Sequence, residues 1–257
     1  MKKLIIRAIV GIAIVYSPGS YGNSINKSTE AKDTTTKEAT LPQTEQALQP
    51  HGYLVANYSI NDKAAYKKYM HSVGVFISKY KGKVIIYDVN IKPLEGNPQK
   101  VIDITEFPSI AEAERFYNSP EYTAAKKLRT SSTQGWVLLA GSVPPSPVAA
   151  TSTPQKIAKP HGYQIVNYTI NDQATFQKYM DAAGPLGPKF NGSVPIFDLN
   201  TKALEGNPKK VFGIAAFPSV AEAERFYHSP EYTAARKFRI ASTEGTTLIA
   251  SSVPPQQ

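Results

Sequence analysis

The chain contains one stretch of about 95 residues twice, and this duplication constrains its architecture more than any other feature. His51–Pro145 recurs as His161–Pro255, with a constant register shift of about 110 residues and no gap. Roughly three positions in five are identical, far more than a shared fold alone requires. We therefore predict two copies of one domain, repeat 1 at 51–145 and repeat 2 at 161–255.

The N-terminus has the pattern of an export signal. A positively charged start at 1–3 precedes an apolar run at 4–15, which Arg7 interrupts and which is too short to span a bilayer. Small residues just before position 23 predict cleavage after Gly22, and an uncleaved membrane anchor is the alternative. We expect a signal peptide at 1–22 and a periplasmic or secreted mature protein with no membrane span.

Two segments outside the repeats have the composition of linkers. Residues 23–50 are rich in Thr, Lys, Glu and Gln, so they cannot bury enough apolar surface to offset the entropy of ordering and are predicted to be a disordered linker. Residues 146–160 are rich in Pro, Ala and Thr, which is typical of a semi-extended tether. Such a tether would let the two repeats pair within the chain.

The net charge of +9 does not by itself indicate a nucleic-acid partner. The positive residues outside the leader are scattered, as on solvated helix faces. RNA binding by a sheet would require an RNP-like aromatic signature, which the sequence lacks. We expect no nucleic-acid partner, and weak attraction to acidic surfaces of the cell envelope stays open.

Each repeat has the pattern of a β-α-β-β-α-β fold. Runs of β-branched and aromatic residues predict strands in repeat 1 at 53–60, 82–89, 100–107 and 136–140. A turn at 95–98 is expected within a loop between the second and third strands.

The helices have clear start and stop signals. Asp62 is the predicted N-cap of the first helix in repeat 1. In repeat 2 the first helix should end near Gly184, because two prolines follow. A capping box at 109–112 and a second cap at Ser119 predict a broken second helix. Because capping explains both Ser109 and Ser119, we do not expect either to be a nucleophile.

Several motifs resemble the bacterial family known as domain of unknown function 1330 (DUF1330). They are Leu94-Glu95-Gly96, Glu106-Phe107-Pro108-Ser109, Ala113, Arg115-Phe116-Tyr117, Ser119-Pro120-Glu121-Tyr122 and Arg129. The resemblance covers both repeats and implies the fold of the dimeric α+β barrels, in which two ferredoxin-like sheets meet. We therefore predict two ferredoxin-like domains paired as an intrachain barrel pseudo-dimer. Related barrels include cofactor-free monooxygenases, isomerases and haem-handling enzymes, so the resemblance selects no activity.

The two repeats depart from each other in ways that bear on function. The family usually has Gly-Gly-Arg at the entry to the second strand. This chain instead has Lys81-Gly82-Lys83 in repeat 1 and Asn191-Gly192-Ser193 in repeat 2. Glu106 becomes Ala216 in repeat 2, and Asp103 becomes Gly213. We therefore expect any ligand or chemistry to belong chiefly to repeat 1.

Glu106 is the candidate catalytic residue. It shares a strand face with Ile102 and Ile104, and a carboxylate among apolar neighbours can act as a general acid or base. The alternative is a glutamate at the sheet edge that reaches water.

The candidate ligand-binding residues recur in both repeats. They are Asn57, Asp88, Tyr122 and Arg129 in repeat 1, and Asn167, Asp198, Tyr232 and Arg239 in repeat 2. Alternation places Asp88 on one strand face with Val84 and Ile86, and Asn57 on the face of Tyr53. If these faces line a barrel, they form a polar patch in an apolar pocket, and the alternative is a half-solvated sheet. Core packing of the tyrosines and helix-dipole placement of the arginines are alternatives for these residues.

The sequence predicts neither a metal nor a cofactor. The four histidines, at 51, 71, 161 and 228, lack metal-ligand spacing, and no Gly-rich phosphate loop is present. The absence of cysteine excludes disulfides and thiolate chemistry.

The leading functional hypothesis is a small-ligand-binding or interaction module of the bacterial cell envelope. A cofactor-free barrel enzyme, monooxygenase- or isomerase-like and using Glu106, is the alternative, so enzymatic activity stays open with a non-enzyme favoured. A purely structural pseudo-dimer is the third possibility.

Overall fold

The computed structural model describes residues 50–142 and 161–252. The leader predicted at 1–22 lies outside these residues, as do the predicted linkers apart from Pro50. Repeat 1 consists of β1 (Gly52–Ile60), α2 (Lys63–Lys79), β2 (Lys83–Asp88), β3 (Lys92–Glu95), β4 (Val101–Phe107), α3 (Ile110–Tyr117), α4 (Pro120–Ser132) and β5 (Thr133–Gly141). Repeat 2 consists of β6 (Gly162–Ile170), α5 (Gln173–Ala183), the 3-10 helix η2 (Gly184–Phe190), β7 (Ser193–Asp198), β8 (Lys202–Glu205), β9 (Val211–Phe217), α6 (Val220–His228), α7 (Pro230–Ser242) and β10 (Thr243–Ser251).

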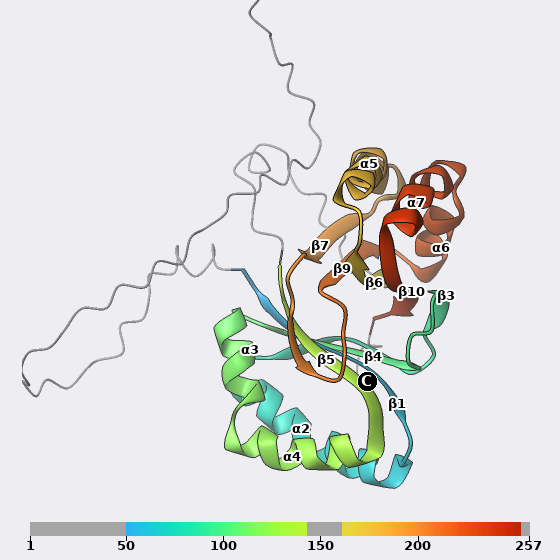
Figure 1. The fold of residues 1–257 in the computed structure, drawn as a ribbon. Coiled ribbons are helices and arrows are strands. Elements are labelled where there is room, and N and C mark those ends of the chain that lie inside the picture. Colours follow the sequence, from blue (N-terminus) through green and yellow to red (C-terminus); the bar gives the residue numbers. More distant parts are fainter. Residues whose placement is uncertain (1–49, 143–160, 253–257) are drawn as a thin grey trace, which may run out of the picture. The chain divides into compact units, whose positions relative to one another are not determined.

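The predicted β-α-β-β-α-β order is confirmed in both repeats. In each, the long strands form an antiparallel sheet, and the helices of that repeat cover one of its faces (Figure 1). In the described residues, no helix has the length and apolar character needed to cross a membrane.

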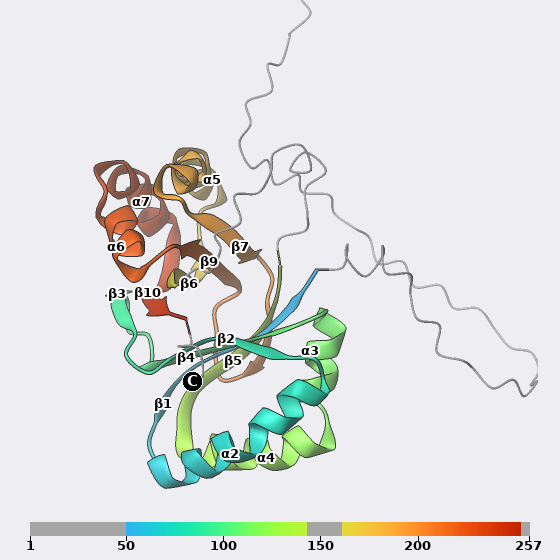
Figure 2. The ribbon, with the colours of Figure 1, turned by 180° about the vertical axis from the view of Figure 1, so that it is seen from behind.

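The short strands β3 and β8 are exchanged between the repeats. β3 pairs with β10 of repeat 2, and β8 pairs with β5 of repeat 1. The sheet orders are therefore β2-β4-β1-β5-β8 and β3-β10-β6-β9-β7, and Figure 2 shows β3 beside β10 from behind. The prediction of a plain loop before the third strand is wrong at 92–95, because the hydrogen-bond partner of this strand belongs to the other repeat.

A glycine ends each exchanged strand at a close approach of the two repeats. Gly96 and Gly206 have φ of +64° and +63°, in the left-handed region that favours glycine. A Cβ added to Gly96 would lie 2.5 Å from the carbonyl oxygen of Gly245, and one added to Gly206 would lie 2.5 Å from that of Gly135. The motif Leu94-Glu95-Gly96 is thus the end of an exchanged arm and its turn.

The helix-free faces of the two sheets share one apolar core. This core includes Val55, Ile86, Ile102, Ile104 and Leu138 from repeat 1 and Ile165, Ile196, Phe212, Ile214 and Leu248 from repeat 2, all 3% exposed or less. Pairing removes two apolar sheet faces from water, which is the main driving force for such contacts. The chain therefore forms the predicted pseudo-dimer of ferredoxin-like domains.

Helix capping follows the sequence with one difference. Asp62 accepts hydrogen bonds from the amides of Ala64 and Ala65, at 2.9 and 3.0 Å. Ser109 caps α3 through the amide of Glu112, but the Glu112 carboxylate accepts from Arg115 at 2.6 Å, so only half of the capping box forms. In repeat 2 the helix ends at Ala183, as the prolines predict, and η2 continues it in 3-10 form.

Candidate ligand-binding site in repeat 1

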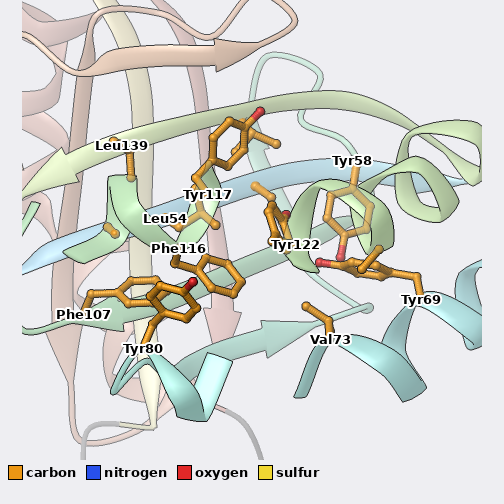
Figure 3. Close-up of a cluster of buried hydrophobic side chains, with 14 of the residues drawn as sticks. Leu54, Tyr58, Tyr69, Val73, Tyr80, Phe107, Phe116, Tyr117, Tyr122 and Leu139 are labelled. Carbon is orange, nitrogen blue, oxygen red and sulfur yellow. The ribbon is translucent and has the colours of Figure 1, made fainter. Parts of the chain in front are cut away.

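A cavity of about 150 Å³ lies between the helices and the sheet of repeat 1. Its apolar and aromatic wall comprises Leu54, Ala56, Tyr69, Met70, Val73, Ile77, Val84, Tyr87, Phe116, Tyr122 and Val137, and its polar residues are Asp103, Thr105 and Arg129. Figure 3 shows the ring cluster beside it, in which the Phe116 ring centroid lies 4.4 Å from that of Tyr122. The cavity is on the helix side of the sheet and not between the two sheets.

Strand alternation directs Asp103 into this cavity. On β4, Val101 and Phe107 pack in the core under the helices, whereas Ile102 and Ile104 face the other sheet. Asp103 has the parity of Val101, so its carboxyl enters the interior on the helix side.

The Asp103 carboxyl has no partner among the described residues. It makes no hydrogen bond or ion pair with them, and its Oδ1 is shielded from solvent. Burial raises the pKa of Asp103 to about 7, and the positive charge of Arg129 opposes this rise. Buried carboxyl oxygens are almost always hydrogen-bonded, so an unpaired one beside a cavity marks a place for a hydrogen-bond donor.

A chain of tyrosine hydroxyls runs close to Asp103. The hydroxyl oxygens of Tyr58 and Tyr66 lie 2.5 Å apart, and those of Tyr66 and Tyr87 lie 3.2 Å apart. Burial raises the pKa of Tyr58 well above its ordinary value, and the negative charge of Asp103 adds to the rise. The hydroxyls therefore stay protonated, and Asp103 is the acidic group of the cavity that ionises near neutral pH.

Arg129 connects the cavity to repeat 2. Its Nη2 lies 2.5 Å from Oε1 of Glu205, which ends the exchanged strand β8, and the Tyr117 hydroxyl donates to the same oxygen at 2.6 Å. The mirror contact joins Arg239 to Glu95, at 2.6 Å. There the hydrogen bonds and charge of Arg239 outweigh burial, so the pKa of Glu95 is lowered. We call these two ion pairs the cross-repeat clasps.

The equivalent region of repeat 2 is lined by different residues. Gly213 replaces Asp103, and a Cβ added there would lie 3.0 Å from the ring of Phe197. The rings of Phe176 and Phe197, which stand where repeat 1 has Tyr66 and Tyr87, are parallel within 1°. Gln164 replaces Leu54 and donates to the Tyr232 hydroxyl at 2.8 Å.

Glu106, the predicted catalytic residue, lies on the other face of the sheet. Its Oε1 accepts from the Tyr53 hydroxyl at 3.1 Å and lies 2.8 Å from Nδ1 of His51. The side chain is 29% exposed and does not line the cavity of repeat 1. Its catalytic role stays a prediction.

The asparagines predicted to bind a ligand, Asn57 and Asn167, form hydrogen bonds with backbone groups of their own repeats. The Asn57 amide donates to the carbonyls of Gln99 and Val101 and accepts from the amide of Gln99, with distances of 2.7–3.0 Å. Asn167 repeats these contacts with Lys209 and Val211. Their amide groups thus fix the segment before β4 and before β9.

The predicted aspartates join the two repeats. Asp88 accepts from the amide of Ser251 at 2.8 Å, and Asp198 accepts from the amide of Gly141 at 2.8 Å. The predicted shared face of Val84, Ile86 and Asp88 is wrong for Val84, because a β-bulge between Val84 and Ile86 shifts the alternation. Val84 therefore lines the cavity on the helix side.

Of the predicted site residues, the structure brings Tyr122 and Arg129 to the cavity of repeat 1. Tyr232 and Arg239 occupy the equivalent positions in repeat 2. Asp103 was absent from the predicted site, although its signal was available. It is the one charged residue on a strand face with Val101, Thr105 and Phe107, and it is lost in the second copy.

A search for metal ligands within residues 50–142 and 161–252 finds no group of three His, Cys, Asp or Glu side chains that could hold an ion.

The fold defines a class of protein, the tandem ferredoxin-like chains that form a pseudo-dimer from two five-stranded sheets. The chain belongs to the family "Domain of unknown function (DUF1330)", whose sequence model matches residues 51–142 and 161–253. No curated protein sequence matches it.

Among the solved structures with a similar course of the chain are three proteins with different names. A chlorite dismutase variant from Candidatus Nitrospira defluvii is 11% identical, with a TM-score of 0.49 and coverage of 82% of this chain and 95% of that one. An anthrone oxidase-like protein is 13% identical, with a TM-score of 0.47 and coverage of 79% and 92%. A haem-binding protein from Thermus thermophilus is 11% identical, with a TM-score of 0.44 and coverage of 80% and 92%. With TM-scores below 0.5, these similarities carry no argument about function.

Proposed function

We propose that the protein binds a small organic molecule in the cavity of repeat 1, and that repeat 2 serves as its scaffold. The observation that carries this proposal is the unpartnered carboxyl of Asp103 at the wall of an apolar cavity. Leaving such a group unpaired costs about 1–3 kcal/mol or more, and repeat 2 shows that the same scaffold accepts glycine there. A ligand that donates to Asp103 would account for the retained carboxylate.

A cofactor-free enzyme is the second candidate, and Asp103 supports it better than Glu106 does. A pKa of about 7 suits a general acid or base at neutral pH. Turnover of the bound molecule by the wild type, and its loss in Asp103→Asn, would favour the enzyme over the binding protein.

We also propose that the mature protein is periplasmic or secreted. The N-terminal pattern of residues 1–22 supports this proposal. N-terminal sequencing of the protein from fractionated cells should begin at Asn23 in the envelope or medium fraction. A cytoplasmic protein that retains Met1 would contradict it.

The binding function is tested by mass spectrometry of small molecules extracted from the purified protein. Wild type and Glu106→Gln should carry the same compound, and Asp103→Gly, which copies repeat 2, should lose it. Loss from Glu106→Gln with retention in Asp103→Gly would move the site to the other face of the sheet. An extract without any compound, together with unchanged thermal stability in the presence of a metabolite library, would reject the binding function.

A further inference from the structure

We propose that the ligand of the repeat 1 cavity is a single-ring aromatic molecule with one hydrogen-bond donor, such as a ring hydroxyl, which Asp103 accepts. This inference rests on the proposed binding function and names the chemical class of the ligand. It stands on the size of the cavity, the nature of its wall and the distribution of charge around it.

The size of the cavity limits the ligand to about one ring. Its volume is about 150 Å³. An apolar protein cavity of about the same volume binds benzene, which gives the scale for the comparison. A ring with one small substituent fills this space, whereas a fused ring system or a nucleotide would extend out of it into solvent.

The wall of the cavity favours an aromatic ring. Leu54, Val73 and Val137 supply aliphatic surface, and Tyr69, Phe116 and Tyr122 supply aromatic rings. Aromatic rings attract one another in offset and tilted arrangements beyond their buried area. A flat apolar molecule therefore gains contacts here that a branched polar molecule would not.

Charge around the cavity favours a donor and disfavours an anion. Arg129 is occupied by Glu205 through the clasp, and Tyr122 and Tyr69 are hydrogen-bonded to each other in the wall. Among the described residues, Oδ1 of Asp103 and Nε of Arg129 are the buried polar atoms of the cavity without a hydrogen-bond partner. The charge of Arg129 is already paired with Glu205, whereas Asp103 has no paired cation in the described part of the chain and as a carboxylate only accepts hydrogen bonds. An anionic ligand would meet like charge at Asp103, whereas a hydroxyl or amino group would satisfy it.

Each part of this inference has a matched probe. Phenol, benzene, cyclohexanol and benzoate are titrated calorimetrically into the full chain at pH 8, where Asp103 is mainly ionised. Benzene lacks the donor, cyclohexanol lacks the aromatic ring, and benzoate replaces the donor with an anion. The variants are Asp103→Asn and, as a control, Asp181→Asn, which removes a carboxylate on the surface of α5 in repeat 2.

We expect phenol to bind the wild type and the Asp181→Asn control equally. Benzene and cyclohexanol should each bind the wild type at least about tenfold more weakly than phenol does. Asp103→Asn should lower the affinity for phenol by about tenfold, because the variant loses a charge-assisted hydrogen bond. Benzoate should not bind. Absence of phenol binding, equal binding of benzoate, or phenol affinity unchanged in Asp103→Asn would overturn the inference. If extraction then yields a different compound that depends on Asp103, the binding function stands and only the ligand class falls.

Discussion

Repeat 1 and repeat 2 share a backbone scaffold but differ in the chemistry of their interiors. Where repeat 1 has Asp103, Thr105, Tyr66 and Tyr87 under its helices, repeat 2 has Gly213, Ala215, Phe176 and Phe197. Each of these changes removes a polar group, so that the parallel rings of Phe176 and Phe197 stand in repeat 2 where repeat 1 has tyrosines. An apolar interior is the default of a folded domain, so the polar one of repeat 1 is the part that calls for a functional explanation.

The residues that hold the two repeats together differ much less. Glu95 and Glu205, Arg129 and Arg239, and Asp88 and Asp198 make reciprocal contacts across the interface. The scaffold of the duplication is thus symmetric, while the interior of one copy is specialised. Repeat 2 supplies an exchanged strand and an apolar sheet face to repeat 1.

The largest effect is expected when a clasp is broken. Glu205→Ala and Glu95→Ala should each lower the free energy of unfolding by about 3–5 kcal/mol, because each leaves a buried arginine unpaired. Only Glu205→Ala should also weaken phenol binding, since its partner Arg129 lines the cavity. Urea unfolding and calorimetry measure both quantities. If Glu95→Ala weakens binding as much as Glu205→Ala, the two repeats share the site and the interior of repeat 1 is not specialised by itself.

A smaller effect, with a characteristic pH dependence, is expected for Asp103→Asn. The carboxyl has a pKa near 4 in the unfolded chain and about 7 in the folded one. Between pH 4 and pH 7 it is therefore ionised in the unfolded chain but still protonated in the folded one. The stability contributed by this site is therefore present below pH 4 and is lost as the pH rises to 7. Asp103→Asn should be more stable than the wild type by roughly 2–4 kcal/mol at pH 8 and nearly equal to it at pH 3.5.

Urea titrations at pH 3.5, 5.5 and 8 check this dependence. The Asp181→Asn control should show little difference from the wild type at any of these pH values. If the free energy of unfolding of Asp103→Asn already exceeds that of the wild type by the full amount at pH 3.5, the carboxyl is not held neutral by burial.

The smallest effect concerns the turn before the second strand of each repeat. Lys81 and Asn191 have φ of +57° and +52°, in the left-handed region. Lys81→Gly should stabilise the protein by about 1 kcal/mol, because glycine adopts this conformation without steric cost. Asn191→Gly should gain less than half of that, since asparagine tolerates the left-handed region. Thermal unfolding compares the two, and a larger gain from Asn191→Gly would contradict the backbone explanation.

Much of the fold follows from local signals in the sequence. The caps at Asp62 and Ser119, and the prolines after Ala183, act within a few residues, so the structure has the helices where these signals place them. The strand runs around Val55 and Ile104 are similarly local, because alternation and β-propensity are properties of neighbouring residues.

The candidate site could be predicted only in part. Tyr122 and Arg129 were recognised through the motif that carries the family resemblance, and both reach the cavity. The face of Val84 could not be predicted, because a β-bulge leaves no clear mark in a short strand. Asp103 could have been recognised as a candidate from its loss in repeat 2. The alternation of side chains along the strand assigns Asp103 to one face of the sheet, but it does not show which face borders a cavity.

By itself, the sequence determined that two copies of one α+β domain exist, where their helices begin and end, and that a carboxylate is present at position 103 in one copy only. These are consequences of local propensity and of the duplication. Only the tertiary structure decided that strands 92–95 and 202–205 pair with the opposite repeat, and that Glu205 holds Arg129 at the cavity. These contacts join residues more than sixty positions apart, and they form only when two complete sheets bury their apolar faces against each other.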